Sequence, residues 1–246
     1  MNERQFFYFV AMLARLDAAF EAQRRFTSRA AHELRTPLTI LKGEAQVALG
    51  RRRTVEEYEA LLRSSLEEID KLVQIIDELL LLARYESGET DIPCEPVALH
   101  EIVRTVAAQL QPIARQKEIE LVVETEEHYV EGDAKALERL VCKLMENAVF
   151  YTPQGGRAVI RLRRNDEQIA LTVEDNGIGI APEELEHVFE RFYRARAARE
   201  LRPEGSGIGL ALVTTIARLH RATVDVSSEK GKGTRFVVNF QRQPIA

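Results

Sequence analysis

Two stretches of sequence decide the fold of the first third of the chain: Leu34–Ala48, LRTPLTILKGEAQVA, and Leu62–Leu80, LRSSLEEIDKLVQIIDELL. In each stretch, apolar residues recur at alternating steps of four and three, which is the 3.5-residue period of a seam between packed helices. Between the stretches Gly50 interrupts the pattern, and Thr54 with Glu57 has the spacing of a helix-capping box. The sequence therefore predicts an antiparallel hairpin of two helices.

The apolar seam of the first helix continues backward through Ala31 and, more weakly, through Phe20 and Leu13 to Phe6. Such a helix would have about 45 residues and a length of roughly 68 Å at ~1.5 Å of rise per residue. Two helices cannot bury two seams well, so we expect a second copy of the chain to complete a four-helix bundle. The predicted assembly is a homodimer formed through the hairpin.

A polar segment with two prolines, Gly88–Pro96, separates the hairpin from a region of mixed pattern. After it, helical and strand-like segments follow one another in an order that suggests a two-layer α/β sandwich with antiparallel strands. The predicted helices are Val97–Lys117, Asp133–Phe150, Glu183–Phe189 and Ile208–His220, and the predicted strands are Ile119–Glu124, Ala158–Arg163, Ile169–Glu174, Thr223–Ser228 and Thr234–Phe240.

The composition bounds the possible functions. The chain has 246 residues, 45% of them hydrophobic, and a net charge of −5, which argues against a general nucleic-acid binder. The two cysteines, Cys94 and Cys142, indicate neither a disulfide framework nor a cysteine-based metal site. The longest apolar run near the start, Phe6–Ala14, has nine residues, whereas a membrane-spanning helix needs about 20. We therefore expect no membrane span in this chain.

A cluster of chemically active residues lies beside the seam of the first helix. His32 and Glu33 are adjacent, and Thr36 is one turn further along the face that carries His32. Pro37 lies inside the helical pattern, where it costs about 3 kcal/mol, so it requires a reason. On spacing alone, a solvated surface histidine is the commoner explanation. The alternative is a nucleophilic imidazole whose N–H proton is held or accepted by Glu33.

Three glycine motifs follow in the second region: Asp175–Gly179, Gly205–Gly209 and Gly231–Thr234. The first places a carboxylate after an apolar strand, where it could accept hydrogen bonds from a base edge. The second opens a helix, whose N-terminal N–H groups favour phosphate. Neither motif fits a Walker loop or a dinucleotide fingerprint, and the third could be a plain hairpin turn. Each motif alone is weak, but together they indicate a nucleotide pocket.

The segment Arg191–Glu204 holds five arginines and two glutamates, a local net charge of +3 in an acidic chain. Such a segment could serve as a lid over phosphates, although for Arg196, Arg199 and Arg202 we prefer a solvated position. On the preceding helix, the carboxamide oxygen of Asn147 could bind Mg²⁺, and a simple surface asparagine is the alternative.

Together these motifs resemble the sensor histidine kinase family of two-component systems, over about residues 20–240 and in the family's order. Six segments carry the resemblance: His32–Leu38 resembles the H-box, Asn147–Pro153 the N-box, Asp175–Gly179 the G1 box, Phe189–Arg194 the F-box, Gly205–Leu210 the G2 box and Gly231–Thr234 the G3 box. The combination is specific although its parts are not, and it favours the nucleophilic reading of His32.

The resemblance implies four parts: a signalling helix over 1–24, as a possible remnant of a HAMP module; a dimerisation and histidine-phosphotransfer domain over 25–87; a linker over 88–96; and a Bergerat-type ATP-binding domain over 97–243. It also implies that this chain is the cytoplasmic part of a sensor that its parent protein anchors in the inner membrane.

The activity that the resemblance implies is ATP- and Mg²⁺-dependent phosphorylation of His32, with Glu33 as base, followed by transfer to an aspartate of a response regulator. Thr36 would orient water for dephosphorylation of the regulator, Asn147 would hold Mg²⁺, and Asp175 would bind the adenine amino group. The implied nucleotide-binding residues are Asn147, Tyr151, Asp175, Gly177, Gly179, Arg191, Arg194, Gly205, Gly207, Gly209, Leu210 and Thr234.

Three departures from the family pattern keep other functions open. Lys143 stands where a second asparagine is common, Phe150 stands where a lysine is frequent, and Arg221-Ala222 replace a frequent Gly-Gly pair. One alternative is a non-catalytic ATP-sensing scaffold, or one that acts only as a phosphatase. Another is an ATPase of the same fold without phosphotransfer.

Overall fold

The computed structural model describes residues 3–86, 95–165 and 168–241. The chain divides into two compact units, Met1–Asp77 and Glu78–Ala246, and each is described by itself. Among the described residues, no helix is both long enough and apolar enough to cross a membrane.

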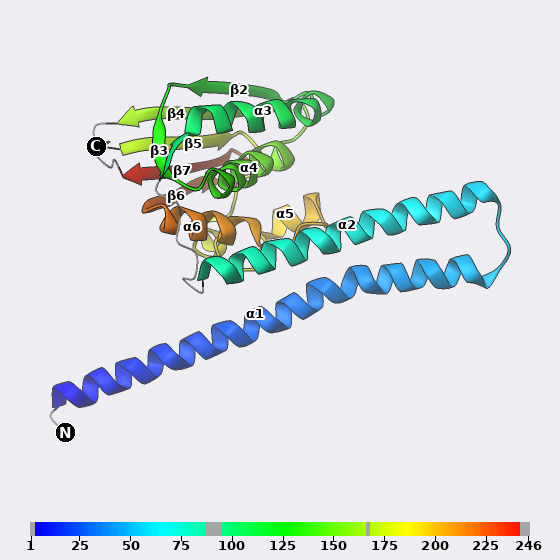
Figure 1. Cartoon of the computed structure of the whole chain (residues 1–246), viewed down its shortest axis with the longest axis horizontal. Coiled ribbons are helices and arrows are strands. Elements are labelled where there is room, and N and C mark those ends of the chain that lie inside the picture. The colour runs from blue at the N-terminus through cyan, green and yellow to red at the C-terminus, as the bar shows by residue number, and fades with distance from the viewer. Residues whose placement is uncertain (1–2, 87–94, 166–167, 242–246) are drawn as a thin grey trace. The chain divides into compact units, whose positions relative to one another are not determined.

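The first unit is built from two helices, α1 (Glu3–Gly50) and α2 (Val55–Glu86), joined by a short connection (Figure 1). The predicted hairpin is confirmed, and Pro37 lies inside α1. The last turns of α2, from Glu78 onward, belong to the second unit. Of the predicted seam, the side chain of Phe6 lies outside the described residues.

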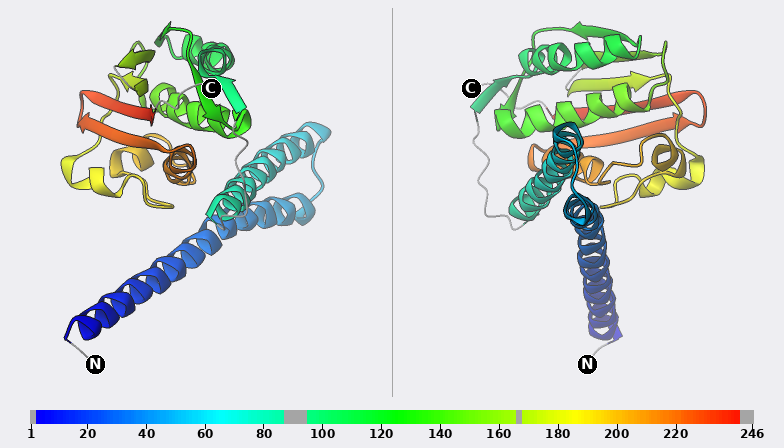
Figure 2. Two further views of the ribbon diagram at one scale, coloured as in Figure 1. Left: turned by 60° about the vertical axis from the view of Figure 1, so that its left-hand side comes forward. Right: turned by 90° about the vertical axis from the view of Figure 1, so that its right-hand side faces the viewer.

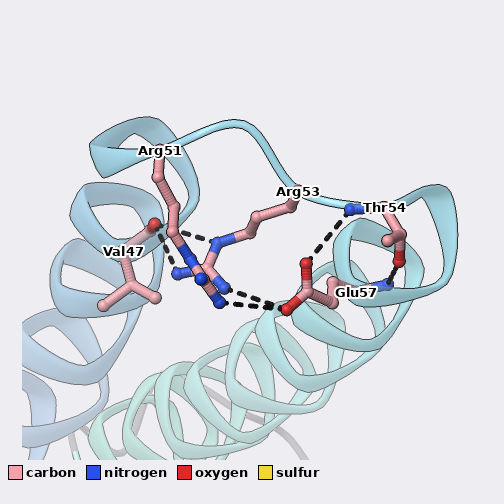
Figure 3. A network of polar contacts seen from close by, with 5 residues as sticks. All are labelled: Val47, Arg51, Arg53, Thr54 and Glu57. Carbon is pink, nitrogen blue, oxygen red and sulfur yellow. Dashed lines mark hydrogen bonds and ion pairs between the residues drawn. The ribbon is translucent and has the colours of Figure 1, made fainter.

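The connection between the helices is fixed by the predicted capping box and by two arginines (Figure 3). The backbone N–H of Thr54 donates to Oε2 of Glu57 at 3.1 Å, and the N–H of Glu57 donates to Oγ1 of Thr54 at 3.3 Å. Arg53 donates twice to the Val47 carbonyl, at 3.1 and 3.0 Å, which satisfies an acceptor in the last turn of α1. Arg51 pairs with Glu57 at 3.2 Å. Helix α2 therefore begins where its sequence indicates.

Polar and apolar side chains divide the surface of the hairpin. Glu44 of α1 accepts hydrogen bonds from Ser64 and Ser65 of α2 at 2.5 and 2.6 Å, and these bonds hold the pKa of Glu44 below its usual value. Seam residues are exposed in the single chain: Leu38, Leu62, Leu66, Ile69, Val73, Ile76 and Leu80. An exposed row of this kind indicates an interaction surface.

The second unit is a five-stranded sheet in the order β2-β4-β5-β7-β6, with helices packed on one face, and a separate two-stranded sheet of β1 and β3 (Figure 1). The strands are β1 (Glu95–Ala98), β2 (Glu120–Thr125), β3 (Tyr129–Gly132), β4 (Arg157–Asn165), β5 (Gln168–Asp175), β6 (Ala222–Glu229) and β7 (Gly233–Gln241). The helices are α3 (Leu99–Gln116), α4 (Ala134–Tyr151), the 3-10 helix η1 (Pro182–His187), α5 (Arg196–Leu201) and α6 (Gly209–Leu219).

The sheet differs from the prediction in one pairing. The pairs β4–β5, β5–β7 and β7–β6 are antiparallel, as expected. Strand β2, however, pairs with β4 in parallel, with Leu121 opposite Ala158. A parallel pair needs a long crossover, and β3 with α4 supplies it between these two strands. The pattern of a short strand reveals its existence but not the direction of its partner.

Three short elements were not predicted. Residues 95–98 form β1, so α3 begins at Leu99 rather than at Val97, and β1 pairs with β3 through Val97 and Val130. Helix α5 forms within the basic segment Arg191–Glu204, where no helix was predicted. Strands of four residues and a helix of six are too short to show a clear apolar period.

The core of the second unit lies between the sheet and helices α3, α4 and α6 (Figure 2). Its largest fully buried side chains come from the sheet and from all three helices: Leu99, Leu137, Leu140, Leu144, Met145, Ile160, Leu162, Leu171, Leu212 and Ile216. Leu82 and Tyr85, from the last turns of α2, are also buried in this unit. The core fixes α4 and the end of β5, which carry the candidate site.

Candidate functional site

The phospho-acceptor candidate is an exposed histidine on a continuous helix. His32 is exposed on α1, and Glu33 beside it is half-buried. The hydroxyl of Thr36 donates to the His32 carbonyl at 3.3 Å, one turn away. Pro37 has no N–H with which to bind the Glu33 carbonyl. His32, Glu33 and Thr36 thus lie together in the first unit, and the imidazole is open to an incoming reactant.

Asp175, the last residue of β5, is the centre of the candidate nucleotide-binding site in the second unit. Its Oδ1 accepts hydrogen bonds from the N–H groups of Gly177 at 2.8 Å and Thr234 at 3.2 Å. Burial raises the pKa of Asp175 to about 6, although these two hydrogen bonds act in the opposite direction. Because both bonds go to Oδ1, the other carboxylate oxygen remains for an external donor such as an amino group.

The first and third glycine motifs meet at this carboxylate, so the third is more than a hairpin turn. A Cβ on Gly233 would lie 1.9 Å from the Asp175 carbonyl oxygen, and a Cβ on Gly177 would lie 2.4 Å from the Tyr151 carbonyl oxygen. Gly179 has a φ of +62°, and its Cβ would lie 2.0 Å from the Glu229 carbonyl oxygen. These positions exclude side chains, because backbone from another segment fills the space.

Two residues hold the ends of α4, which carries Asn147 and Tyr151. At the N-terminus Asp133 is the N-cap residue, and its side chain accepts from the N–H groups of Lys135 and Ala136. At the C-terminus the Lys117 ammonium donates to three carbonyls, those of Val149, Phe150 and Thr152, at 2.7, 3.0 and 2.8 Å. A cation there also matches the negative end of the helix dipole. The helix that carries Asn147 is therefore held at both of its ends.

Lys143, the departure from the N-box pattern, is part of a half-buried ionic cluster one turn before Asn147. Its Nζ lies 2.7 Å from Oε1 of Glu78 and 3.4 Å from Oε2 of Glu146. The hydroxyl of Ser206, in the second glycine motif, donates to Glu78 at 2.9 Å. Burial alone would lower the pKa of Lys143, but the two carboxylates outweigh it and hold that pKa above its usual value. Lys143 is therefore a charged residue with carboxylate partners.

The basic segment folds around Arg194. Its guanidinium donates to the carbonyls of Pro203 at 2.8 Å and Ala198 at 3.1 Å, and to that of Arg202. Gly205 packs against it, since a Cβ there would lie 3.0 Å from its Cζ. Gly207, with a φ of +70°, accepts the N–H of Phe192 at its carbonyl, which joins the two ends of the segment. Arg194 thus holds the segment together, because its guanidinium binds three of the segment's own carbonyls.

The remaining predicted residues lie at the edges of the same region. Arg191 is half-buried on the basic segment, and Gly209 and Leu210 form the first turn of α6. A Cβ on Gly209 would lie 3.5 Å from Cδ of Lys143. The N-terminus of α6 therefore faces the helix that carries Asn147, in an arrangement suited to an anion between them.

Several residues that shape this region were not predicted. Ser228 donates to the Gly233 carbonyl at 2.7 Å and accepts from the N–H of Ile180 at 2.8 Å, so it ties the first and third glycine motifs together. Its place opposite Thr234 follows from the hairpin register, which could have identified it. Glu78 and Lys117 act over long sequence separations and left no local signal.

A magnesium ion would find few ligands of its own here. Within the described parts of the chain, no group of three or more His, Cys, Asp or Glu side chains could hold a metal ion. Mg²⁺ usually takes one or two protein oxygens and completes its octahedron with substrate phosphates and water. The carboxamide of Asn147 fits that pattern.

Comparisons with known proteins agree with both units. The family model "His Kinase A (phospho-acceptor) domain" matches residues 22–88, and the model "Histidine kinase-, DNA gyrase B-, and HSP90-like ATPase" matches residues 132–244. The sensor histidine kinase CusS of Escherichia coli O6:H1 is 37% identical over 227 residues, which are 92% of this chain and 47% of that protein. The chain thus spans about half the length of the curated relatives it matches.

Solved structures give the same result. The mycobacterial sensor histidine kinase MprB is 32% identical, with a TM-score of 0.54 over 61% of this chain and 100% of that chain. The histidine kinase ThkA, in complex with a response regulator protein, shares the fold, with a TM-score of 0.71 at 21% identity over 95% of this chain and 67% of that one. With a phospho-acceptor helix hairpin and an ATP-binding α/β domain in the same order, the chain belongs to the sensor histidine kinase family of two-component systems.

Proposed function

We propose that this chain is an ATP-dependent protein-histidine kinase that phosphorylates itself on His32 and passes the phosphoryl group to an aspartate of a response regulator. The observation that carries the proposal is the exposed imidazole of His32, beside Glu33 and in front of Pro37, in a chain that also holds an ATP-binding domain. We further propose residues 25–87 as the phosphotransfer domain and 97–243 as the catalytic domain.

In the first step, the unprotonated ring nitrogen of His32 attacks the γ-phosphorus of ATP. A nitrogen–phosphorus bond forms, the bond from phosphorus to the bridging oxygen breaks, and ADP leaves with that electron pair. Glu33 takes the N–H proton from the ring, which leaves the ring of the phosphohistidine neutral. In the second step a carboxylate oxygen of the regulator attacks the same phosphorus, the nitrogen–phosphorus bond breaks, and the leaving imidazole takes back the proton from Glu33.

Binding of the nucleotide is assigned to the residues around Asp175. Its second carboxylate oxygen accepts the adenine amino group, and the glycines at positions 177 and 179 let the backbone of Tyr151 and Glu229 pack closely beside it. We assign the phosphates to the N–H groups at the start of α6 and to Arg191 of the basic segment. Asn147 supplies the protein oxygen for Mg²⁺, whose chemistry is to neutralise charge on the phosphates.

The partners are a second copy of the chain and a response regulator. The exposed seam of the hairpin supports a homodimer, because a single chain leaves those side chains in water. The ThkA structure, solved with a response regulator protein, supports a receiver domain as the second partner. Thr36, whose hydroxyl lies one turn from His32, would hydrogen-bond a water molecule that attacks the regulator's phosphoryl group. We propose that the parent protein is a membrane-anchored sensor.

The test is incorporation of γ-labelled phosphate from ATP with Mg²⁺. We expect acid-labile, base-stable label on the wild-type chain and none on His32→Gln. The matched control is His187→Gln, a half-exposed histidine of the ATP-binding domain whose side chain pairs with Glu190. Equal labelling of His32→Gln would refute the assignment of the acceptor. Transfer is then followed by adding receiver domains to the labelled chain.

One observation favours a second candidate function. Lys143 brings a positive charge to the position of a metal ligand, so the site can bind ATP without the usual metal geometry. A scaffold that senses ATP or acts only as a phosphatase would bind nucleotide, incorporate no label, and still remove phosphate from a phosphorylated receiver domain. An ATPase without phosphotransfer would instead release phosphate at a steady rate that survives loss of His32.

A further inference from the structure

The last turns of α2 carry a row of buried side chains on one face. Glu78, Leu82 and Tyr85 are 7%, 1% and 7% exposed, and all three belong to the second unit. Their spacing of four and three residues places them on the same side of a helix. The exposed seam residue Leu80 lies about 200° around the helix from Glu78 and from Leu82, at ~100° per residue. The docked face, Glu78 with Leu82 and Tyr85, is therefore distinct from the seam.

Glu78 is the charged member of the docked face, and its partners belong to the candidate nucleotide site. The Nζ of Lys143 lies 2.7 Å from Oε1 of Glu78, and the Ser206 hydroxyl donates to its Oε2 at 2.9 Å. Ser206 is in the second glycine motif, and Lys143 is on α4, one turn before Asn147. One carboxylate thus joins the end of α2 to two segments of the site.

The same carboxylate lies beside the start of α6. The Ser206 hydroxyl that donates to Glu78 also accepts the N–H of Ile208, the N-cap residue of α6, at 3.3 Å. Gly209, the first residue of α6, faces Lys143, because a Cβ there would lie 3.5 Å from Cδ of that lysine. A negative charge near the N-terminus of a helix is favourable. Glu78 therefore supplies an anion close to the N–H groups to which we assign the ATP phosphates.

Two anions compete at this corner. Glu78 is largely buried, so water and salt screen its charge weakly. Phosphates at the start of α6 would repel the carboxylate, and they would compete with it for the Ser206 hydroxyl and the Lys143 ammonium. Coupling of this kind is reciprocal: the factor by which docking of α2 weakens ATP binding is the factor by which ATP weakens docking.

We propose that Glu78 is an autoinhibitory latch: its carboxylate holds the last turns of α2 on the ATP-binding domain, and binding of ATP at the start of α6 releases them. The proposal rests on the proposed function, since it names the regulation of the same nucleotide site. It also explains the lysine at position 143, because an asparagine there would leave the charge of a buried carboxylate without compensation.

The first test is equilibrium binding of a non-hydrolysable ATP analogue with Mg²⁺, and of adenosine, to the full chain. Glu78→Gln removes the charge but keeps an oxygen for the Ser206 hydroxyl, so analogue binding should tighten about tenfold while adenosine binding stays unchanged. The matched control is Asp77→Asn, which removes an exposed acid one residue earlier and should change neither affinity. Unchanged or weaker analogue binding in Glu78→Gln, or an equal gain for adenosine, would overturn the proposal.

A second variant loosens the docked face without changing a charge. Leu82→Ala truncates the most buried side chain of that face, so it should tighten analogue binding about threefold or more, because ATP then has less docking to displace. An unchanged affinity in Leu82→Ala would mean that ATP releases no docked helix, and the latch would be refuted.

The wild-type chain gives a test that needs no variant. Amide hydrogen exchange over residues 79–86 should become about threefold faster or more when the analogue binds, whereas residues 158–162 of β4 should not change. Unchanged or slower exchange over 79–86 in the liganded chain would overturn the latch and leave the proposed function standing, because the nucleotide has bound. A wild-type chain that bound no analogue would instead remove the proposed function, and the latch with it.

Discussion

The ammonium of Lys143 lies 2.7 Å from a carboxylate oxygen of Glu78, in a position where both side chains are largely buried. Glu78 also accepts the hydroxyl of Ser206, so the end of α2, the helix of Asn147 and the second glycine motif share one charged group. A buried ion pair is costly to break, because removal of one partner leaves the other charge without compensation. Loss of either partner should therefore destabilise the part of the fold around Lys143, which is also part of the candidate nucleotide site.

We expect Glu78→Gln to lower the free energy of unfolding of the second unit by about 3 kcal/mol, as for other buried pairs that lose one partner. Lys143→Asn alone should cost less, because Glu78 keeps the hydroxyl of Ser206. The double variant should be more stable than the sum of the single changes predicts, with a coupling energy above about 1 kcal/mol. Denaturant unfolding of the four proteins measures these values.

The matched control for this cycle is the pair of Lys232 and Glu229, which has a similar distance of 2.6 Å but exposed side chains. Its coupling energy should stay within about 0.2–1 kcal/mol, the range of surface pairs. Equal coupling energies for the two pairs would show that burial of the Lys143 pair has no energetic consequence.

A second prediction concerns the ionisation of Asp175. Because burial raises its pKa to about 6, the folded chain binds a proton there that the unfolded chain has already lost. The stability contribution of this group is therefore greatest at low pH and is lost as the pH rises through about 6. Asp175→Asn, which keeps the acceptor for Gly177 and Thr234, should raise the melting temperature at pH 7.5, and the gain should shrink towards pH 4.5.

The same ionisation should govern recognition of the base. Adenosine, which carries no phosphate that titrates, should bind the wild type about tenfold more weakly at pH 5 than at pH 7.5, as the carboxylate acceptor of Asp175 is protonated. Asp175→Asn should bind adenosine poorly at both values. The control is Asp225→Asn, an exposed aspartate on β6. A pH profile that is identical in the wild type and Asp175→Asn would contradict this role.

Features of this protein that depend on neighbours in sequence could be predicted, and those that depend on distant residues could not. The capping box of Thr54 and Glu57 follows from a three-residue spacing, and the structure confirms it. The parallel pairing of β2 with β4 depends on where the chain returns after α4, which no local period records. Likewise, the contact between Phe150 and Arg202 joins residues that lie far apart in the chain, so no local pattern indicates it.

The capping box itself gives a further prediction. Thr54→Ala removes the acceptor for the Glu57 N–H and should destabilise the hairpin by about 1 kcal/mol. Thr39→Ala is the control, because that hydroxyl donates to a carbonyl in the middle of α1 and caps no helix end. Thermal unfolding followed by helix circular dichroism separates the two. Equal effects of the two changes would mean that the cap does not determine where α2 begins.

The exposed seam of the hairpin tests the assembly. Leu66 is 59% exposed in the single chain, and a dimer that buries it gains about 2 kcal/mol from each copy. Leu66→Glu should therefore raise the dimer dissociation constant more than about a hundredfold, which light scattering over a range of concentrations can measure. Leu49→Glu is the control, because Leu49 is 88% exposed and lies one residue off the seam that ends at Ala48. If Leu66→Glu remained as dimeric as Leu49→Glu, the seam would not be the dimer interface, and the row of exposed leucines on α2 would need another occupant.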